Sequence, residues 1–389
     1  MITAVTDASQ VAEARRLVSG YARSTGVPEA RVGSVAIVVT ELATNLLKHA
    51  GSGHILATHR DDGEGVGLEL LALDRGDGMA DVGRCMDDGY STAGSPGNGL
   101  GAIARLADDI RIYSRPGLGS AIMVRFFQQT ARDTQRALLG AAVAAYPGEQ
   151  VCGDNWAFSD TGQGRTLLMV DGAGHGIEAA RAADLAVQIF RQNVAAPCVE
   201  IVERVHRALM PTRGAAVAVA RIDEAARTIR YVGVGNICGT LVTGEGARHM
   251  VSHNGTAGHV APRIREFTYD YTSNPLVIMH SDGLTSRWDL ASYPGLVTQH
   301  PSLIAGVLLR DETAEYAEYV GHHHEQRQRH DASQQAWCHQ VFHRIGRECR
   351  ECVDLIGDAH RADLGRHSGT DASRHHQSGQ HRTQFTGDR

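Results

Sequence analysis

The chain has 389 residues, which is enough for two domains of ordinary size, since domains typically span about 100–200 residues. Its 42% hydrophobic and 21% charged residues are typical of a soluble globular protein, and a net charge of −6 argues against nucleic-acid binding, which needs a concentrated basic face. The sequence shows neither the n- and h-regions of a signal peptide nor an apolar run near the roughly 20 residues that span a bilayer, and its seven irregularly spaced cysteines suit reduced thiols, so we expect a cytoplasmic protein without membrane contact.

The first third of the chain predicts helices followed by an antiparallel sheet. Apolar residues recur at helical spacing over 8–25 and again over about 29–50. From His54 to Leu73, and on both sides of the glycine turn at 117–119, the sequence is strand-like. Helices beside an antiparallel sheet predict an α+β sandwich, which we assign to residues 1–130.

A second unit follows a polar joint at 128–135. Strand-like segments recur on both sides of one long helical stretch from Ile177 to Leu209, which predicts another α+β layered domain over 136–311. From residue 312 the composition changes, because more than half of the 21 histidines lie there among many Gln, Arg and Ser residues. Such a segment buries little apolar area, so we expect 312–389 to be a mostly disordered tail.

The helix predicted over 29–50 carries a pair of polar residues suited to phosphate chemistry. Glu41 and Asn45 are four residues apart and therefore share one helix face. A carboxylate can orient or deprotonate a nucleophile, and an amide oxygen can bind Mg²⁺ that is held by phosphates. Taken alone, this placement is explained equally well if the two residues simply belong to an ordinary polar face of the helix.

Two further clusters follow in an order that makes chemical sense. Asp74 ends a strand, where its carboxylate can accept a hydrogen bond from an adenine amino group, and the glycines after it let the backbone approach a base closely. A glycine-rich loop at 89–101 then enters a helix, whose first N–H groups favour a bound phosphate. A glycine-rich loop alone is weak evidence for a phosphate site, because glycine also occurs in turns for conformational reasons. The three clusters in this order predict a nucleotide pocket.

These clusters resemble the N, G1 and G2 boxes of the GHKL (Bergerat) ATP-binding fold. The segments ELATNLLKHAGSG, DDGYSTAG and GNGLGAIARLAD are similar to the switch serine kinases of partner-switching pathways, over about residues 1–127. The resemblance implies ATP and Mg²⁺ as cofactors, with Glu41 as the catalytic carboxylate, Asn45 as the Mg²⁺ ligand and Asp74 as the adenine reader. It further implies that the nucleotide walls and lid comprise Gly76, Gly78, Thr92, Gly97, Gly99, Leu100 and Gly101.

Two other GHKL classes fit the sequence less well. A sensor histidine kinase needs a phosphoacceptor helical hairpin, and only about 40 residues precede Glu41. General ATPase machinery is disfavoured because no transducer or clamp domain accompanies the nucleotide pocket.

In the second unit, aspartates stand at strand ends beside glycines. Asp154, Asp171 and Asp282 are separated in sequence, but strand ends can converge on one edge. Hard divalent ions require several oxygen ligands, and a pair of ions can activate water for in-line attack on a phosphate ester. Any one Asp-Gly pair is more often a turn than a ligand, so the pairs alone do not decide the matter.

The phrases between these aspartates strengthen the metal interpretation. LLMVDGAGHGIEAA, GVGNICG and VIMHSDGLTSRW occur in the order found in the SpoIIE-like branch of the PPM phosphatases, and the similarity runs over about 136–310. It implies an α-β-β-α sandwich in which Asp154, Asp171, Asp282 and the Gly172 carbonyl bind Mn²⁺ or Mg²⁺, with Asp171 central to catalysis. For His175, orientation of phosphate or water and local capping of the glycine turn both remain open.

The end of the chain departs from this family. PPM domains usually finish with an Asp-Asp pair and a final strand, and no such phrase follows Asp311. The resemblance therefore implies a missing edge strand, a missing ligand, weakened metal binding and impaired phosphatase activity. The tail residues Cys338, His339, His343, Cys349 and Cys352 match no common zinc spacing, which favours adventitious metal affinity over a zinc domain.

The two resemblances together suggest a bifunctional partner-switching regulator. We expect it to phosphorylate and dephosphorylate Ser or Thr of STAS-domain antagonists, either anti-anti-sigma or stressosome-like proteins, in a bacterial stress or sigma-factor pathway. The alternative is an ATP-dependent protein-binding switch with a degenerate, inactive phosphatase domain. Slow or absent labelling together with tight partner binding would favour that alternative.

Overall fold

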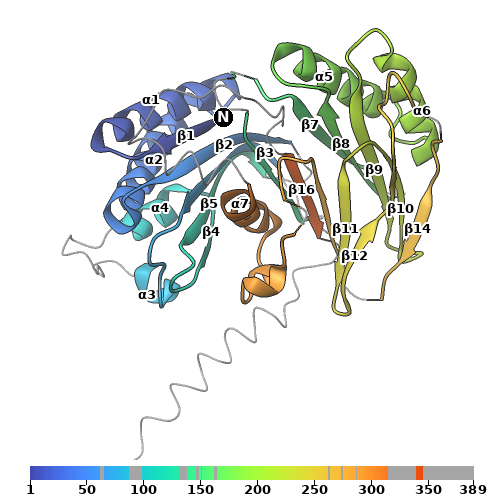
Figure 1. Cartoon of the computed structure of the whole chain (residues 1–389). Helices are drawn as coiled ribbons and strands as arrows, with labels where there is room; N and C mark the ends of the chain where they lie inside the picture. Colours follow the sequence, from blue (N-terminus) through green and yellow to red (C-terminus); the bar gives the residue numbers. More distant parts are fainter. Residues whose placement is uncertain are drawn as a thin grey trace, which may run out of the picture. The chain divides into compact units, whose positions relative to one another are not determined.

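The computed structural model describes residues 1–61, 65–86, 99–130, 138–145, 149, 151–161, 164–261, 263–272, 275–285, 287–313 and 339–344. Met1–Gly346 forms one compact unit of the chain. Within it, two α+β halves follow one another along the chain (Figure 1). The expected fold classes are confirmed.

The N-terminal half is one antiparallel sheet with helices on one face. The strands lie in the order β1-β2-β3-β5-β4. Their bounds are β1 Ile2–Val5, β2 Gly53–Asp61, β3 Gly65–Asp74, β4 Asp109–Ser114 and β5 Ser120–Thr130. The helices are α1 Ala8–Ser24, α2 Glu29–Ala50, α3 Val82–Met86 and α4 Gly99–Leu106. This sheet and its helices form the ATPase sandwich predicted from the sequence.

Helices α1 and α2 form because their ends and apolar stripes are well specified. The Asp7 carboxylate accepts hydrogen bonds from the N–H groups of Ser9 and Gln10, which caps α1. Gly51 ends α2 in the left-handed conformation that favours glycine. Seven buried residues of α2 contribute to the core beneath the sheet: Val32, Val35, Val38, Val39, Leu42, Ala43 and Leu46.

Helix α2 corrects one sequence expectation. Within the described part of the chain, its length and apolar composition alone would permit a helix to cross a membrane. The buried residues of α2 instead pack in the ATPase core, and core helices share the same composition.

The C-terminal half contains two facing sheets. One has the order β13-β10-β9-β8-β7, with β14 also paired to β10, and the other has the order β12-β11-β15-β16-β6. The strands of the first sheet are β7 Asp154–Asp160, β8 Arg165–Gly172, β9 Ala215–Asp223, β10 Thr228–Val234, β13 Ser252–His253 and β14 Phe267–Asp270. Those of the second are β6 Leu138–Val143, β11 Cys238–Thr243, β12 Gly246–Met250, β15 Leu276–His280 and β16 His339–Arg344.

Helices complete the outer layers of this half. Helices α5 (Ile177–Gln192) and α6 (Cys198–Leu209) pack their apolar faces on the β7–β10 sheet. Helix α7 (Pro301–Glu312) packs on the other sheet, beyond the short 3₁₀ turns η1 (Leu290–Ser292) and η2 (Leu296–Thr298). The layers are therefore α-β-β-α, as expected, and the core between the sheets includes Tyr231, Leu139 and Met279.

The two halves share α7. Residues Pro301 to Arg310 of this helix are all buried, because the ATPase sheet covers the side that the phosphatase sheet does not. Figure 1 shows α7 between the ATPase strands and β16. Gly306 permits the close contact, since a Cβ there would lie 2.9 Å from Leu73 Cδ2. The apolar interface places both halves in one continuous core.

A buried ionic cluster lies at the start of α7. Glu69 on β3 receives hydrogen bonds from Arg60 Nη1 at 3.1 Å and from Arg125 Nε at 2.7 Å. The hydroxyl of Ser302, at the start of α7, donates to the same carboxylate at 2.9 Å. Arg60 also donates to the Leu139 carbonyl at 2.6 Å. Charges and hydrogen bonds from both halves therefore meet where water is excluded.

Strand β16 corrects the expectation for the end of the domain. We expected no ordered strand after residue 311, but His339–Arg344 pairs antiparallel with both β15 and β6. A strand between two others satisfies its backbone groups on both sides, so main-chain pairing compensates for a composition poor in aliphatic residues. The remaining tail positions, with Cys338, Cys349 and Cys352, lie outside the described residues.

Candidate functional sites

The first site is built around one face of α2. Glu41 and Asn45 are both partly exposed on this face, and the start of α4 lies against them. A Cβ at Gly99 would lie 3.1 Å from Glu41 Oε2 and 3.6 Å from Asn45 Oδ1. The helix start, the carboxylate and the amide predicted from the sequence are therefore brought together, and glycine at position 99 keeps the space between them open.

Asp74 is held at the end of β3 by backbone donors. Its Oδ1 accepts hydrogen bonds from Gly76 N–H at 2.9 Å and Ser120 N–H at 3.1 Å. Among the described residues Oδ2 has no hydrogen-bond partner, which leaves it for a ligand donor such as an adenine amino group. Burial raises the pKa of Asp74, and the two backbone hydrogen bonds oppose this effect.

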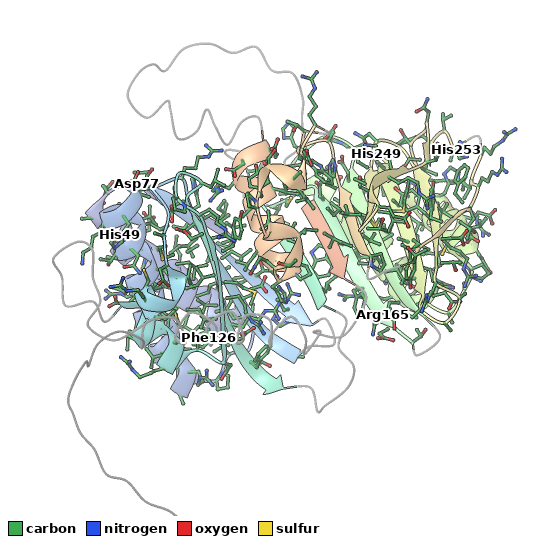
Figure 2. The ribbon with its side chains drawn as sticks, turned by 90° about the horizontal axis from the view of Figure 1, so that it is seen from below. His49, Asp77, Phe126, Arg165, His249 and His253 are labelled. Atoms are coloured by element: carbon green, nitrogen blue, oxygen red, sulfur yellow. The ribbon has the colours of Figure 1, made fainter. Side chains whose placement is uncertain are left out.

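The glycines after Asp74 allow close backbone packing at the end of β3. A Cβ at Gly76 would lie 2.7 Å from the His49 carbonyl oxygen, so glycine lets this turn pack on the end of α2. Gly78 has φ +72°, and a Cβ there would lie 2.0 Å from the Arg115 carbonyl oxygen. Figure 2 shows His49 and Asp77 at this end of the ATPase half.

The lid is described only in part. Leu100 and Gly101 lie in α4, where Gly101 is buried and Leu100 packs against the ATPase core. Thr92 and Gly97 lie outside the described residues. The described residues fit a Mg²⁺-nucleotide, because a carboxylate, an amide oxygen and a helix start lie close together around Gly99.

The second site begins with two aspartates on adjacent strands. Asp154 on β7 and Asp171 on β8 are direct cross-strand partners and are only 3% and 7% exposed. Like charges facing each other across a sheet are destabilising. Burial raises the pKa of Asp171 well above its usual value, and the carboxylates of Asp154 and Asp282 raise it further. An arrangement that costs stability in this way indicates a cation site.

Asp282 is the third aspartate of this site. The loop after β15 carries it, and Asn236 Nδ2 donates to its Oδ2 at 2.8 Å. Ser281, the preceding residue, donates to Asp154 Oδ2 at 2.8 Å, which ties this loop to β7. Asp171 and Asp282 both line a cavity of about 400 Å³. Sequence reasoning identified the three aspartates but missed the Asn236 and Ser281 contacts, which only folding reveals.

The three aspartates fit a site for divalent ions in which the ligands are spread apart rather than gathered around one ion. Among the described residues no group of three or more His, Cys, Asp or Glu side chains is close enough to form a single metal cage. The carboxylates of Asp154 and Asp282 nevertheless both raise the pKa of Asp171, so the three side chains lie in one region of the structure. Two ions about 3.5–4 Å apart need ligands spread more widely than one ion does. Gly172, whose N–H donates to the Gly153 carbonyl at 3.2 Å, follows Asp171 at the same strand end.

His175 lines the cavity and has a partner that sequence reasoning missed. Its Nδ1 lies 2.6 Å from Glu149 Oε1, on the loop that precedes β7. The Glu149 carboxylate also lies over the start of α5, where a Cβ at Gly176 would be 3.1 Å from it. The contact fixes the orientation of the imidazole at the cavity wall, which favours a role toward phosphate or water over capping alone.

Family comparisons agree with the two halves. Residues 4–126 match the model of the histidine kinase-like ATPase domain, and residues 162–347 match that of stage II sporulation protein E (SpoIIE). The second match extends through β16. The chain is 33% identical over 112 residues to the serine/threonine-protein kinase RsbT of Bacillus subtilis (strain 168), which spans 29% of this chain and 84% of that protein.

Two solved structures resemble this chain at low sequence identity. RsbX in complex with magnesium is 17% identical, with a TM-score of 0.43, and covers 55% of this chain and 98% of its own. The PP2C phosphatase domain of SpoIIE from Bacillus subtilis, with a fragment of its regulatory domain, is 15% identical with a TM-score of 0.43 and covers 88% and 98%.

Proposed function

Because the chain belongs to the RsbT family of histidine kinase-like ATPases and carries a SpoIIE-type PPM phosphatase domain, we propose that it sets the phosphorylation level of a STAS-domain protein by catalysing both phosphorylation and its reversal. RsbT-like kinase and SpoIIE phosphatase domains are typical of partner-switching signalling. The observation that carries the proposal is that each half retains its own cluster of phosphate-directed side chains. The proposal places the protein in the cytoplasm of a bacterium.

In the kinase half, catalysis depends mainly on positioning. ATP with Mg²⁺ supplies the transferable phosphoryl group when bound. Glu41 orients the acceptor hydroxyl and accepts its proton, while Asn45 would hold the metal through Oδ1. The α4 start beside Gly99 directs N–H groups toward the phosphates. Asp74 Oδ2 distinguishes adenine from bases that lack a donor at the same place.

The kinase proposal is tested with a STAS-domain protein that carries an acceptor serine. The Glu41→Ala variant should lose transfer of radioactive phosphate from ATP while retaining ATP binding, because Glu41 acts on the acceptor. Glu13→Ala, on the exposed surface of α1, is the matched control and should label normally. If Glu41→Ala labels the STAS-domain protein at the same rate as the control, the kinase proposal is wrong.

In the phosphatase half, the aspartates would serve as ligands for divalent ions. Divalent ions supply an activated water and neutralise the phosphate charge when bound. Asp154, Asp171 and Asp282 would hold them, with the Gly172 carbonyl as a further oxygen donor. Ser281 fixes the Asp154 carboxylate, and Asn236 fixes that of Asp282, so the ligand oxygens are oriented before any ion arrives.

A specific observation keeps the binding-switch alternative open for this half. Strand β16 has the sequence HQVFHR, which contains no Asp or Glu. Phosphate release from a phosphorylated STAS-domain protein, measured with Mn²⁺ and without ATP, decides between the two. Release that disappears in Asp171→Ala supports a working phosphatase. An absence of release by the wild-type protein would leave an ATP-dependent binding switch with an inactive phosphatase domain.

A further inference from the structure

One residue of the phosphatase half reaches the nucleotide pocket of the kinase half. Arg310, near the end of α7, is only 2% exposed. Its Nη1 donates to the Asp74 carbonyl oxygen at 2.7 Å and to the Ser120 carbonyl oxygen at 3.3 Å. Ser120 N–H in turn donates to the Asp74 carboxylate. The guanidinium therefore lies directly behind the strand ends from which the adenine-reading side chain projects.

The position of Arg310 is fixed from several sides. Asp311 accepts from its Nε at 2.8 Å and from its Nη2 at 2.6 Å, so a charge partner holds the planar group. Arg75, the residue after Asp74, donates to the Arg310 carbonyl and pairs with Asp311 at 3.4 Å. Contacts thus run in both directions between the turn after β3 and the end of α7.

We propose that Arg310 is a positioning residue for adenine recognition, through which the phosphatase half determines the shape of the kinase pocket. This inference rests on the proposed ATP-binding function. The guanidinium binds the Asp311 carboxylate through Nε and Nη2 while its Nη1 bridges the two carbonyls, and a lysine with a single nitrogen cannot reproduce this arrangement. By joining the ends of β3 and β5, Arg310 fixes the backbone of Asp74 and hence the direction of its free Oδ2. A shift of that oxygen weakens binding of adenine more than binding of the phosphates.

The end of α7 also contacts the metal-site loop. Thr285 N–H donates to the Glu312 carbonyl at 3.1 Å, and Thr285 Oγ1 donates to the Glu312 carboxylate at 3.2 Å. Thr285 lies three residues after Asp282. Consecutive residues of one helix end therefore support the nucleotide pocket on one side and the metal loop on the other.

The test compares ATP and GTP binding by titration calorimetry, using the full chain and no phosphatase substrate. GTP presents a carbonyl where ATP presents the amino group, so the ATP/GTP affinity ratio reports on Asp74. In Arg310→Met we expect this ratio to fall about tenfold, the equivalent of one specific hydrogen bond to a charged group. Arg310→Lys keeps the charge but has no second and third nitrogen for Asp311 to hold, so it should give an intermediate ratio.

Gly306→Ala is the matched control. It crowds Leu73 on the same α7 interface without touching Asp74, so it should lower the unfolding temperature and leave the ATP/GTP ratio unchanged. A ratio within twofold of wild type in Arg310→Met and Arg310→Lys, with both variants folded, would overturn the inference. A ratio lowered equally in Gly306→Ala would also overturn it, since general loosening would then explain the effect. A wild-type protein that binds no ATP would overturn the proposed kinase function itself.

Discussion

Removal of the Glu69 carboxylate should destabilise the whole protein more than an ordinary surface substitution does. Glu69 is 1% exposed and lies between Arg60 and Arg125, each with a side chain only 4% exposed. In Glu69→Ala both guanidinium groups stay buried without their counter-charge. Breaking a buried pair in this way costs about 3–5 kcal/mol of unfolding free energy, whereas exposed pairs contribute about 0–1 kcal/mol.

A second variant separates the effect of the buried charges from the effect of lost side-chain volume. Replacement of Arg60, Glu69 and Arg125 together by Met removes every buried charge of the cluster, and apolar replacements of buried ion groups are often close to neutral. Recovery should be incomplete, because the Leu139 carbonyl and the Ser302 hydroxyl lose partners, at about 1–3 kcal/mol for each unsatisfied group.

The assay is urea unfolding monitored by circular dichroism at pH 7, with free energies from linear extrapolation. A loss below 1 kcal/mol in Glu69→Ala would refute the reasoning, because it would mean that water reaches the cluster. The pH dependence provides a second check. Burial raises the pKa of Glu69, but Arg60 and Arg125 lower it below its usual value overall. Its contribution is therefore present above the unfolded pKa and is lost as the pH falls through the lower folded pKa.

Three further results follow from local geometry. Gly99→Val should reduce ATP affinity by about tenfold or more, because the valine side chain would fill the space beside Glu41. Unchanged binding of a fluorescent ATP analogue would mean that the nucleotide binds elsewhere. In metal-free protein, Asp171→Asn should raise the melting temperature by relieving repulsion while abolishing stabilisation by Mn²⁺; a lower melting temperature would contradict the account. Burial lowers the pKa of His54 to about 4, so protonation of this residue in the unfolded chain should contribute about 2 kcal/mol to the loss of unfolding free energy between pH 7.5 and pH 5. His54→Gln should reduce that loss by about the same amount without abolishing it, because burial also lowers the pKa values of His280 and His300.

The candidate site residues could be located from the sequence because their spacing is local. Glu41 and Asn45 share a helix face at a separation of four residues, and Asp74 ends a strand, so short-range geometry fixes each one. The pairing of Asp154 with Asp171 follows from the register of two adjacent strands. Their partners could not be predicted in the same way, since Glu149 contacts His175 and Asn236 donates to Asp282 from loops that are distant in sequence.

The end of the phosphatase sheet shows where composition misleads. Segment 339–344 contains histidine, glutamine and arginine at most positions, and such a composition predicts little buried area. Its placement between β15 and β6 depends on backbone pairing along both edges, with every residue from His339 to Arg344 in register with β6. Main-chain hydrogen bonds of this kind leave no trace in a hydrophobicity pattern.

The shared helix explains why the two halves form one unit although each resembles a separate family. Helix α7 is buried over ten consecutive residues, from Pro301 to Arg310, which neither sheet alone would achieve. A helix that is apolar on all sides requires apolar surfaces on all sides. The ATPase sheet supplies the second surface through Leu56, Leu71 and Leu73, side chains that would face water in an isolated ATPase domain. Each half therefore completes the hydrophobic core of the other, and the end of α7 contacts both candidate sites, through Arg310 with Asp74 and through Glu312 with Thr285.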